Sequence, residues 1–139
     1  MNKLALVVLV LLTSMVSAQS DMAAIEQTLM NYINGSSYND MEQIQSAFYE
    51  QADLFLTKKD QEIWVLNPKE YAELFQKRTK GEFNGRQGTI LTIDVANTIA
   101  TAKVELRIPA SDLLYVDLFL LKKISGKWKI ISKAATQIQ

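Results

Sequence analysis

Residues 117–131 read DLFLLKKISGKWKII and indicate two strands joined by a tight turn. Apolar residues fill both arms, and Ser125-Gly126 supplies a short turn of the kind that closes a β-hairpin. One carboxylate, Asp117, stands among the apolar residues of the first arm. Burying a carboxylate costs on the order of several kcal/mol unless it is paired or protonated. The segment therefore predicts a sheet that borders a pocket.

The rest of the second half is also strand-like. Strands are expected at residues 89–95, 99–108, 113–122 and 127–133, joined as an antiparallel meander. The 113–122 strand is apolar on both faces, so its second face needs a cover, and a symmetric partner subunit is one candidate. Residues 77–88 hold three glycines and five charged residues, and we expect a solvated loop there.

The first half of the chain is helical. The first helix follows the 3.6-residue period and is expected to start at Ser20 or Asp21 and to close at Gly35 in the left-handed conformation. A second helix should start at Asn39 or Asp40. Its apolar positions are Met41, Ile44, Ala47 and Phe48.

A short hairpin and a third helix come next. Residues 54–56 and 63–66 are expected to pair as the hairpin. Asn67 as N-cap, Pro68 at the first helical position and Glu70 at the third form a strong helix-start signal. Helices followed by strands predict the α+β class.

The first eighteen residues predict a cleaved secretory signal. Lys3 gives a positive start, residues 4–12 form an unbroken apolar run, and Val16-Ser17-Ala18 places small residues at the cleavage site. The run is shorter than the roughly 20 residues of a spanning helix. We therefore expect residues 1–18 to be removed and residues 19–139 to form one exported domain, periplasmic or extracellular, with no membrane attachment.

Composition excludes several classes of function. Lys and Arg total 15 and Asp and Glu total 15, so a nucleic-acid partner is not expected. Cys 0 removes disulfides and a lipoprotein anchor. His 0 and the lack of paired Asp or Glu spacing leave no expected metal site. No Gly-rich nucleotide loop is found, and no cofactor is expected.

Three groups of residues carry a resemblance to a known superfamily. They are Tyr32-Ile33-Asn34-Gly35 with Asp40, the passage Ala47–Asp53, and Asp117 with Leu121, Lys123 and Gly126-Lys127-Trp128-Lys129-Ile130. The order and spacing of these three groups resemble those of the nuclear-transport-factor-2-like superfamily, most closely its lumazine-binding and polyketide-cyclase-like branches. The resemblance implies a cystatin-like α+β cone, in which a curved antiparallel sheet of about four to six strands wraps around three N-terminal helices and encloses a pocket. It also implies a homodimer.

Ketosteroid isomerases of this superfamily offer a pattern of catalytic residues to test. That pattern has a tyrosine on the first helix, a carboxylate base in the first hairpin and a protonated acid on a later strand. Tyr32 and Asp117 are the matching candidates for the catalytic tyrosine and acid. Leu54-Phe55-Leu56 stands where the base would fall, and the chain has no histidine to replace it. The sequence therefore leans against an enzyme.

Asp117 has two interpretations. It orients a ligand or takes part in catalysis, or it fixes the fold through a hydrogen bond to Tyr32, a backbone amide or Trp128. The candidate ligand-binding residues are Tyr32, Phe55, Trp64, Tyr71, Tyr115, Asp117 and Phe119. Core packing is the favoured alternative for Tyr32, Phe55, Trp64 and Tyr71. Lys127, Lys129 and Lys133 are expected to be solvated charges on one face of the last strand.

Three functions remain open at this point. The favoured one is an exported domain that binds a small apolar or aromatic molecule, with no assigned ligand. The second is an isomerase- or cyclase-like enzyme that uses Asp117 and Tyr32. The third is a non-catalytic dimerisation or interaction domain.

Overall fold

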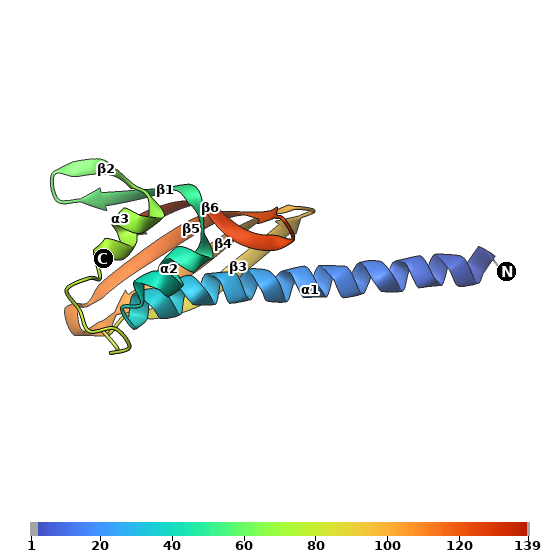
Figure 1. The fold of residues 1–139 in the computed structure, drawn as a ribbon, viewed down its shortest axis with the longest axis horizontal. Helices are drawn as coiled ribbons and strands as arrows, with labels where there is room; N and C mark the ends of the chain where they lie inside the picture. Colours follow the sequence, from blue (N-terminus) through green and yellow to red (C-terminus); the bar gives the residue numbers. More distant parts are fainter. Residues whose placement is uncertain (1–2, 139) are drawn as a thin grey trace.

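The computed structural model describes the backbone of residues 3–138 and the side chains of residues 18–138 (Figure 1). The elements are α1 (Lys3–Ser37), α2 (Met41–Ala47), β1 (Phe48–Lys58), β2 (Gln61–Leu66), α3 (Pro68–Glu73), β3 (Gln87–Ala96), β4 (Ile99–Ile108), a 3-10 turn (Pro109–Ser111), β5 (Leu113–Ile124) and β6 (Lys127–Gln137). This order of helices and strands confirms the α+β class.

The described strands form one curved, open sheet in the order β2-β1-β6-β5-β4-β3. Strands β3 to β6 form the expected antiparallel meander. The hairpin of β1 and β2 joins this meander through a parallel pairing of β1 with β6, which local sequence patterns did not predict. Helices α1 and α2 lie against one face of the sheet, and α3 lies beside the β1–β2 hairpin (Figure 1).

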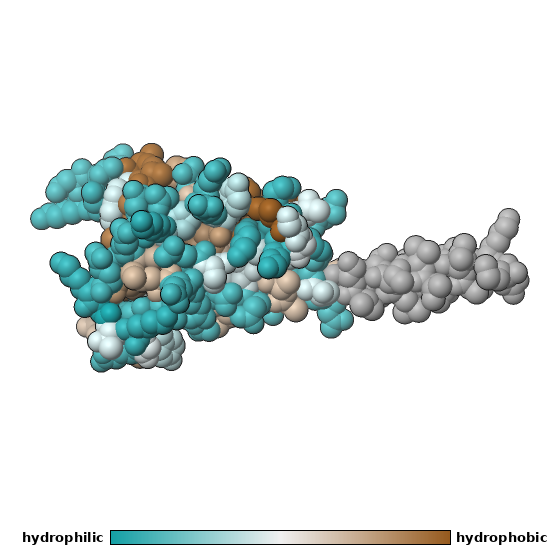
Figure 2. Space-filling model, in the orientation of Figure 1, coloured by the Kyte–Doolittle hydropathy of each residue, from teal (hydrophilic) through white to brown (hydrophobic). Residues whose placement is uncertain are grey.

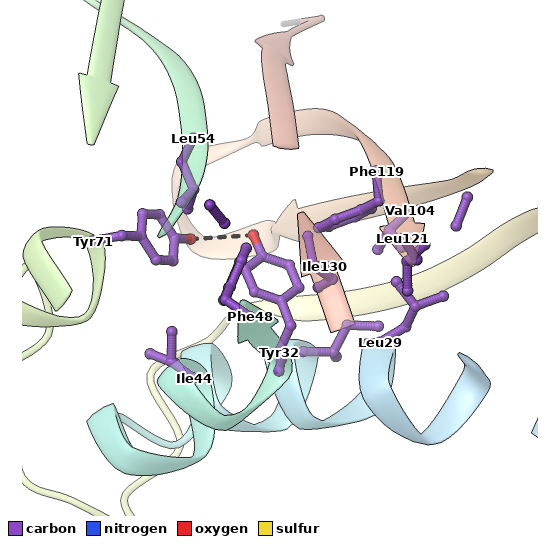
Figure 3. Close-up of a cluster of buried hydrophobic side chains, with 14 of the residues drawn as sticks. Leu29, Tyr32, Ile44, Phe48, Leu54, Tyr71, Val104, Phe119, Leu121 and Ile130 are labelled. Carbon is purple, nitrogen blue, oxygen red and sulfur yellow. Dashed lines mark hydrogen bonds between the residues drawn. The ribbon is translucent and has the colours of Figure 1, made fainter. Parts of the chain in front are cut away.

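The core fills the space between α1, α2 and the inner face of the sheet. Figure 3 shows Leu29 and Tyr32 of α1 directed toward Phe119, Leu121 and Ile130 of the last two strands. The inward residues of β4 and β5 alternate with outward ones, as expected for a sheet with one face on a core. The outer face carries residues such as Lys103 and Leu118.

The first helix differs from the prediction at both ends. It does not start at Ser20 or Asp21, because the chain holds no Pro or Gly between residues 3 and 34 to interrupt it. Gly35 lies inside the helix, and the left-handed residue is Asn39, with φ 58°. Gly35 instead permits close packing, since a Cβ there would lie 2.7 Å from the backbone nitrogen of Ile44.

The other two helix starts are confirmed. Asp40 caps α2, with its side chain accepting a hydrogen bond from the backbone of Gln43 at 3.0 Å. Asn67 and Glu70 form a reciprocal capping box, and Pro68 occupies the first turn of α3. Helix α2 ends one residue earlier than expected, because Phe48 already belongs to β1.

A β-bulge in the last strand changes the position of Lys133. Leu121 of β5 pairs with Ile130, whereas Leu120 pairs with Ser132, so Ile131 is one extra residue in β6. The bulge inverts the alternation of faces, and Lys133 points into the core, 2% exposed. The prediction of a solvated Lys133 is therefore wrong.

The loop before β3 is exposed at residues 77–83 but is tied to the helices. The side chain of Asn39 donates to the backbone carbonyls of Thr79 and Glu82, at 3.0 and 2.7 Å. The side chain of Asn84 donates to the carbonyl of Ser36 and to Asn39, both at 2.7 Å. The end of the loop is thus fixed beside the C-terminus of α1.

The predicted signal peptide remains a prediction. It occupies residues 1–18, and the side chains of residues 1–17 lie outside the described part of the chain. No helix within the described residues is long and apolar enough to cross a membrane.

Candidate ligand cavity

A cavity of about 520 Å³ lies between α3, the β1–β2 hairpin and the inner face of β4, β5 and β6. This volume falls in the range of small-molecule sites, roughly 300–1,000 Å³. Its aromatic and charged lining includes Trp64, Tyr71, Arg86, Tyr115, Asp117 and Lys133. One cavity therefore combines aromatic surface with buried polar groups.

Asp117 is paired inside the protein. Its Oδ2 accepts a hydrogen bond from the Tyr32 hydroxyl at 2.6 Å and lies 3.1 Å from Nζ of Lys133. Asp117 is 1% exposed and Lys133 is 2% exposed, so both charges are removed from bulk water. The ion pair and the hydrogen bond together stabilise the carboxylate in this position.

The two tyrosine hydroxyls form a short chain behind Asp117. The hydroxyls of Tyr32 and Tyr71 lie 3.1 Å apart (Figure 3). The single O–H of Tyr32 donates its hydrogen bond to Asp117. The hydroxyl of Tyr71 must therefore be the donor in the second bond. Burial and the negative charge of Asp117 raise the pKa of Tyr32 well above its usual value, which keeps this proton in place.

Lys133 contacts the faces of both tyrosines. Its Nζ lies 5.4 Å from the ring centroid of Tyr32 and 5.1 Å from that of Tyr71. Such cation–π contacts favour the charged amine beside the rings. The aromatic cluster and the ion pair therefore form one network.

Arg86 is a second cation at the cavity, and the loop positions it. Gly85 adopts φ 92°, a left-handed value suited to glycine, and the backbone N–H of Arg86 donates to Asn84 Oδ1 at 3.1 Å. The guanidinium lies 5.7 Å from the ring centroid of Phe75. Its Nε is buried and has no hydrogen-bond acceptor among the described residues.

The candidate residues from the sequence separate into three groups in space. Trp64, Tyr71, Tyr115 and Asp117 line the cavity. Tyr32 lies behind them and reaches the cavity residues Asp117 and Tyr71 through its hydroxyl. The other two candidates do not line the cavity.

Phe119 and Phe55 lie elsewhere for different reasons. Phe119 is a core residue whose ring meets the ring of Tyr32 edge-on, with centroids 5.2 Å apart. Phe55 is 40% exposed on the outer face of the sheet, because it alternates with Leu54 and Leu56, which face inward. Trp128 does not contact Asp117; its indole N–H donates to Asp21 at 3.0 Å.

Two cavity residues were missed by sequence reasoning. Regular alternation along the last strand predicts a solvated Lys133, and the signal against it is that a buried Asp117 requires a cation. The composition of residues 77–88 predicts a solvated loop and does not indicate that Arg86 reaches the cavity. Within residues 18–138, no three His, Cys, Asp or Glu side chains gather as a metal site requires.

Comparison with known proteins identifies the family. A family model described as "Putative lumazine-binding" matches residues 20–134. A nuclear-transport-factor-2-like protein of unknown function from Shewanella baltica OS155 shares 23% identity and a TM-score of 0.75, over 86% of this chain and 95% of that one. A similar protein from Methylobacillus flagellatus KT shares 27% identity and a TM-score of 0.74, over 86% and 94%.

A more distant structure bears an enzyme-like description. A ketosteroid isomerase-like protein from Erwinia carotovora atroseptica SCRI1043 shares 18% identity and a TM-score of 0.61, over 84% of this chain and 95% of that one. A search of curated proteins returned no match. With the family model covering most of its length, the chain belongs to the "Putative lumazine-binding" family, and its similarity to the Methylobacillus protein places it in the nuclear-transport-factor-2-like superfamily.

Proposed function

We propose that residues 19–139 form an exported domain that binds a small, largely apolar or aromatic molecule in the cavity. The observation that carries the proposal is the cavity itself, where the aromatic side chains of Trp64, Tyr71 and Tyr115 surround the buried Asp117–Lys133 pair. Apolar walls with a few fixed polar groups are typical of small-molecule sites. The family description and the nuclear-transport-factor-2-like structures support a ligand-binding fold.

Ligand binding is tested by thermal unfolding and calorimetry with aromatic, steroid-like and pterin-like compounds. A ligand of the folded state raises the melting temperature in proportion to its occupancy. Trp64→Leu should weaken binding, because Trp64 lines the cavity. Ile63→Leu is the matched control, since Ile63 precedes Trp64 on the same strand but is 65% exposed and does not line the cavity. Failure of all three compound classes to bind would count against the proposal.

An isomerase- or cyclase-like enzyme using Asp117 and Tyr32 has less support. The single O–H of Tyr32 already donates a hydrogen bond to Asp117, so the Tyr32 hydroxyl is not free to stabilise an oxyanion. Lys133 also holds the carboxylate in an ion pair. Leu54 and Leu56 face inward where the base of the isomerase pattern would stand.

We also propose that the domain forms a homodimer through the outer face of the sheet. A row of directly opposed residues crosses four strands there: Val65, Phe55, Ala134 and Leu118. Val65, Phe55 and Leu118 are 46%, 40% and 52% exposed. Figure 2 shows apolar surface where the β1–β2 hairpin lies, among hydrophilic surroundings. Exposed apolar patches of this kind favour association.

Sedimentation at micromolar concentration tests the dimer. Wild type should sediment as a dimer, and Leu118→Glu should sediment as a monomer, because a charge would be buried in the interface. Phe83→Glu is the control, since Phe83 is equally exposed but lies in the loop before β3. A wild-type monomer would contradict the proposal.

A further inference from the structure

We propose that the ligand of the cavity is an organic anion with an apolar or aromatic body, most simply a carboxylate, whose acidic group is held between Arg86 and Lys133. This inference rests on the proposed binding function and names the chemical class of the ligand. Hydrogen-bond donors, charge and lining residues each support it.

The hydrogen-bond groups beside Lys133 include charged donors that the described residues do not fully satisfy. The hydroxyls of Tyr32 and Tyr71 both donate hydrogen bonds within the network, to Asp117 and to Tyr32. The ammonium of Lys133 has three N–H donors, and the ion pair with Asp117 occupies one direction. The remaining N–H donors of Lys133 are therefore available to an acceptor on a ligand.

The guanidinium of Arg86 interacts with Tyr32 and Asp117, but its Nε–H still lacks an acceptor. Its Nε is buried without a hydrogen-bond partner among the described residues. The ion pairs found among those residues also leave out its guanidinium. A buried charged donor without a partner is costly, so such a group in a ligand cavity favours an anionic acceptor. A carboxylate fits a guanidinium with two parallel hydrogen bonds.

The charge balance of the lining agrees with these unsatisfied donors. Four basic side chains and one acidic side chain line the cavity: Lys58, Lys59, Arg86, Lys133 and Asp117. The whole chain has a formal net charge of +0, so this local excess of positive charge is not a consequence of composition. Positive charge around a low-dielectric cavity attracts anions and raises their local concentration.

Aromatic residues define the rest of the ligand. Trp64 and Tyr115 line the cavity with Tyr71, and Lys58 covers the Trp64 ring with its Nζ 4.6 Å from the centroid. A flat apolar body can pack against these rings while its acidic group reaches Arg86. The carboxylate of Asp117 repels further negative charge in the cavity. We therefore expect the ligand to carry a single acidic group.

Calorimetry with matched acid and amide probes tests the inference. The probes are 2-naphthoate with 2-naphthamide, and 4-phenylbutyrate with 4-phenylbutanamide, which differ in charge and little in shape. For the acids we expect binding roughly 10- to 100-fold tighter than for the amides, the size of a charge-assisted hydrogen bond. Rising salt should weaken binding of the acids and leave binding of the amides almost unchanged.

Arg86→Gln should abolish the tighter binding of the acids and should weaken binding of the amides much less. Arg78→Gln is the matched control, because Arg78 is exposed in the same loop. Arg86→Lys should retain part of the preference, since it keeps the charge but loses the two-pronged geometry. If Arg86→Gln fails to fold, the acid–amide difference and its salt dependence in the wild type still decide the matter.

The outcomes separate this inference from the binding function. Equal binding of acids and amides overturns the anion assignment and leaves the binding function standing. Binding of the amides alone does the same. Binding of inorganic phosphate as tight as that of the acids overturns the requirement for an organic body. No binding by any probe or by the aromatic, steroid-like and pterin-like compounds overturns both proposals.

Discussion

Asp117 and Lys133 depend on each other because neither reaches water. Nζ of Lys133 lies 3.1 Å from Oδ2 of Asp117, and both side chains are buried. Such a pair adds little net stability over an apolar substitute, but removal of one partner leaves an uncompensated buried charge. The pair therefore acts as a single unit, and its two residues should be changed together.

Lys133→Met should destabilise the protein by about 3–5 kcal/mol, the usual cost of breaking a buried ion pair. The double variant Lys133→Met/Asp117→Asn should recover most of this loss, since it removes both charges. Urea denaturation measures both effects. Lys127→Met is the control on the same strand, where an exposed side chain should change stability by less than about 0.5 kcal/mol.

An undiminished stability of Lys133→Met would contradict this prediction. It would mean that Asp117 does not need Lys133, and that the hydrogen bond from Tyr32 is enough to hold the acid.

At the scale of residues, the sequence predicted only part of the polar network. Asp117 could be found because a carboxylate among apolar strand residues must be satisfied. The burial of Lys133 could not be predicted, since its position depends on one extra residue in β6. Arg86 could not either, because its position depends on the hydrogen bonds of Asn84 and not on the composition of the loop.

At the scale of elements, Asp21 joins α1 to the β5–β6 hairpin. Its Oδ1 accepts a hydrogen bond from Lys123 at 2.7 Å and one from the Trp128 indole at 3.0 Å. Nearby, the Thr28 hydroxyl donates to the carbonyl of Trp128 at 3.0 Å. The helix and the hairpin are thus connected by polar contacts at the edge of the core.

Asp21→Asn should lower stability at neutral pH, with a loss that depends on pH. The hydrogen bonds from Lys123 and Trp128 lower the pKa of Asp21 below its usual value of 3.8. A carboxyl with a lowered pKa stabilises the fold fully above the unfolded value, and this contribution is lost as pH falls through the folded value. The difference between wild type and variant should therefore be constant from pH 7 to about pH 5 and should vanish at lower pH.

Denaturation curves of both proteins between pH 7 and pH 2 measure this difference. Lys123→Met should show part of this loss at pH 7, because it removes the cation but leaves the hydrogen bond from the Trp128 indole to Asp21. A difference that persists unchanged down to pH 2 would show that the Asp21 carboxylate is not the source of the stability.

At the scale of the whole molecule, removal of the first eighteen residues should leave the domain intact. Among the described side chains, the buried core begins at Ile25, and Asp21 with its partners also lies beyond the predicted cut. The melting temperature of residues 19–139 should therefore match that of the full chain.

Cleavage itself is predicted after Ala18. Protein recovered from the exported fraction of a bacterial host should have an intact mass that corresponds to a start at Gln19. Ala18→Tyr should block processing, because signal peptidase requires a small residue before the cut. Recovery of the uncut wild-type chain from the cell interior would contradict the predicted export.

The fold as a whole was more predictable than the cavity. Helix caps, the period of the strands and the Ser125-Gly126 turn are local signals, and together they gave the α+β class and the meander. The parallel pairing of β1 with β6 joins segments that no local pattern connects. The cavity lies beside this pairing, so its lining could be predicted only in part.

The extra residue Ile131 has a consequence for the comparison of related sequences. A relative whose last strand is regular would place its buried cation one position earlier relative to the Gly126-Lys127-Trp128 turn. An ungapped alignment would then match that cation with Ser132, which faces outward, and Lys133 with a surface residue. Two chains with the same charged cavity would be judged different at its most important position, and a single gap at Ile131 would correct the error.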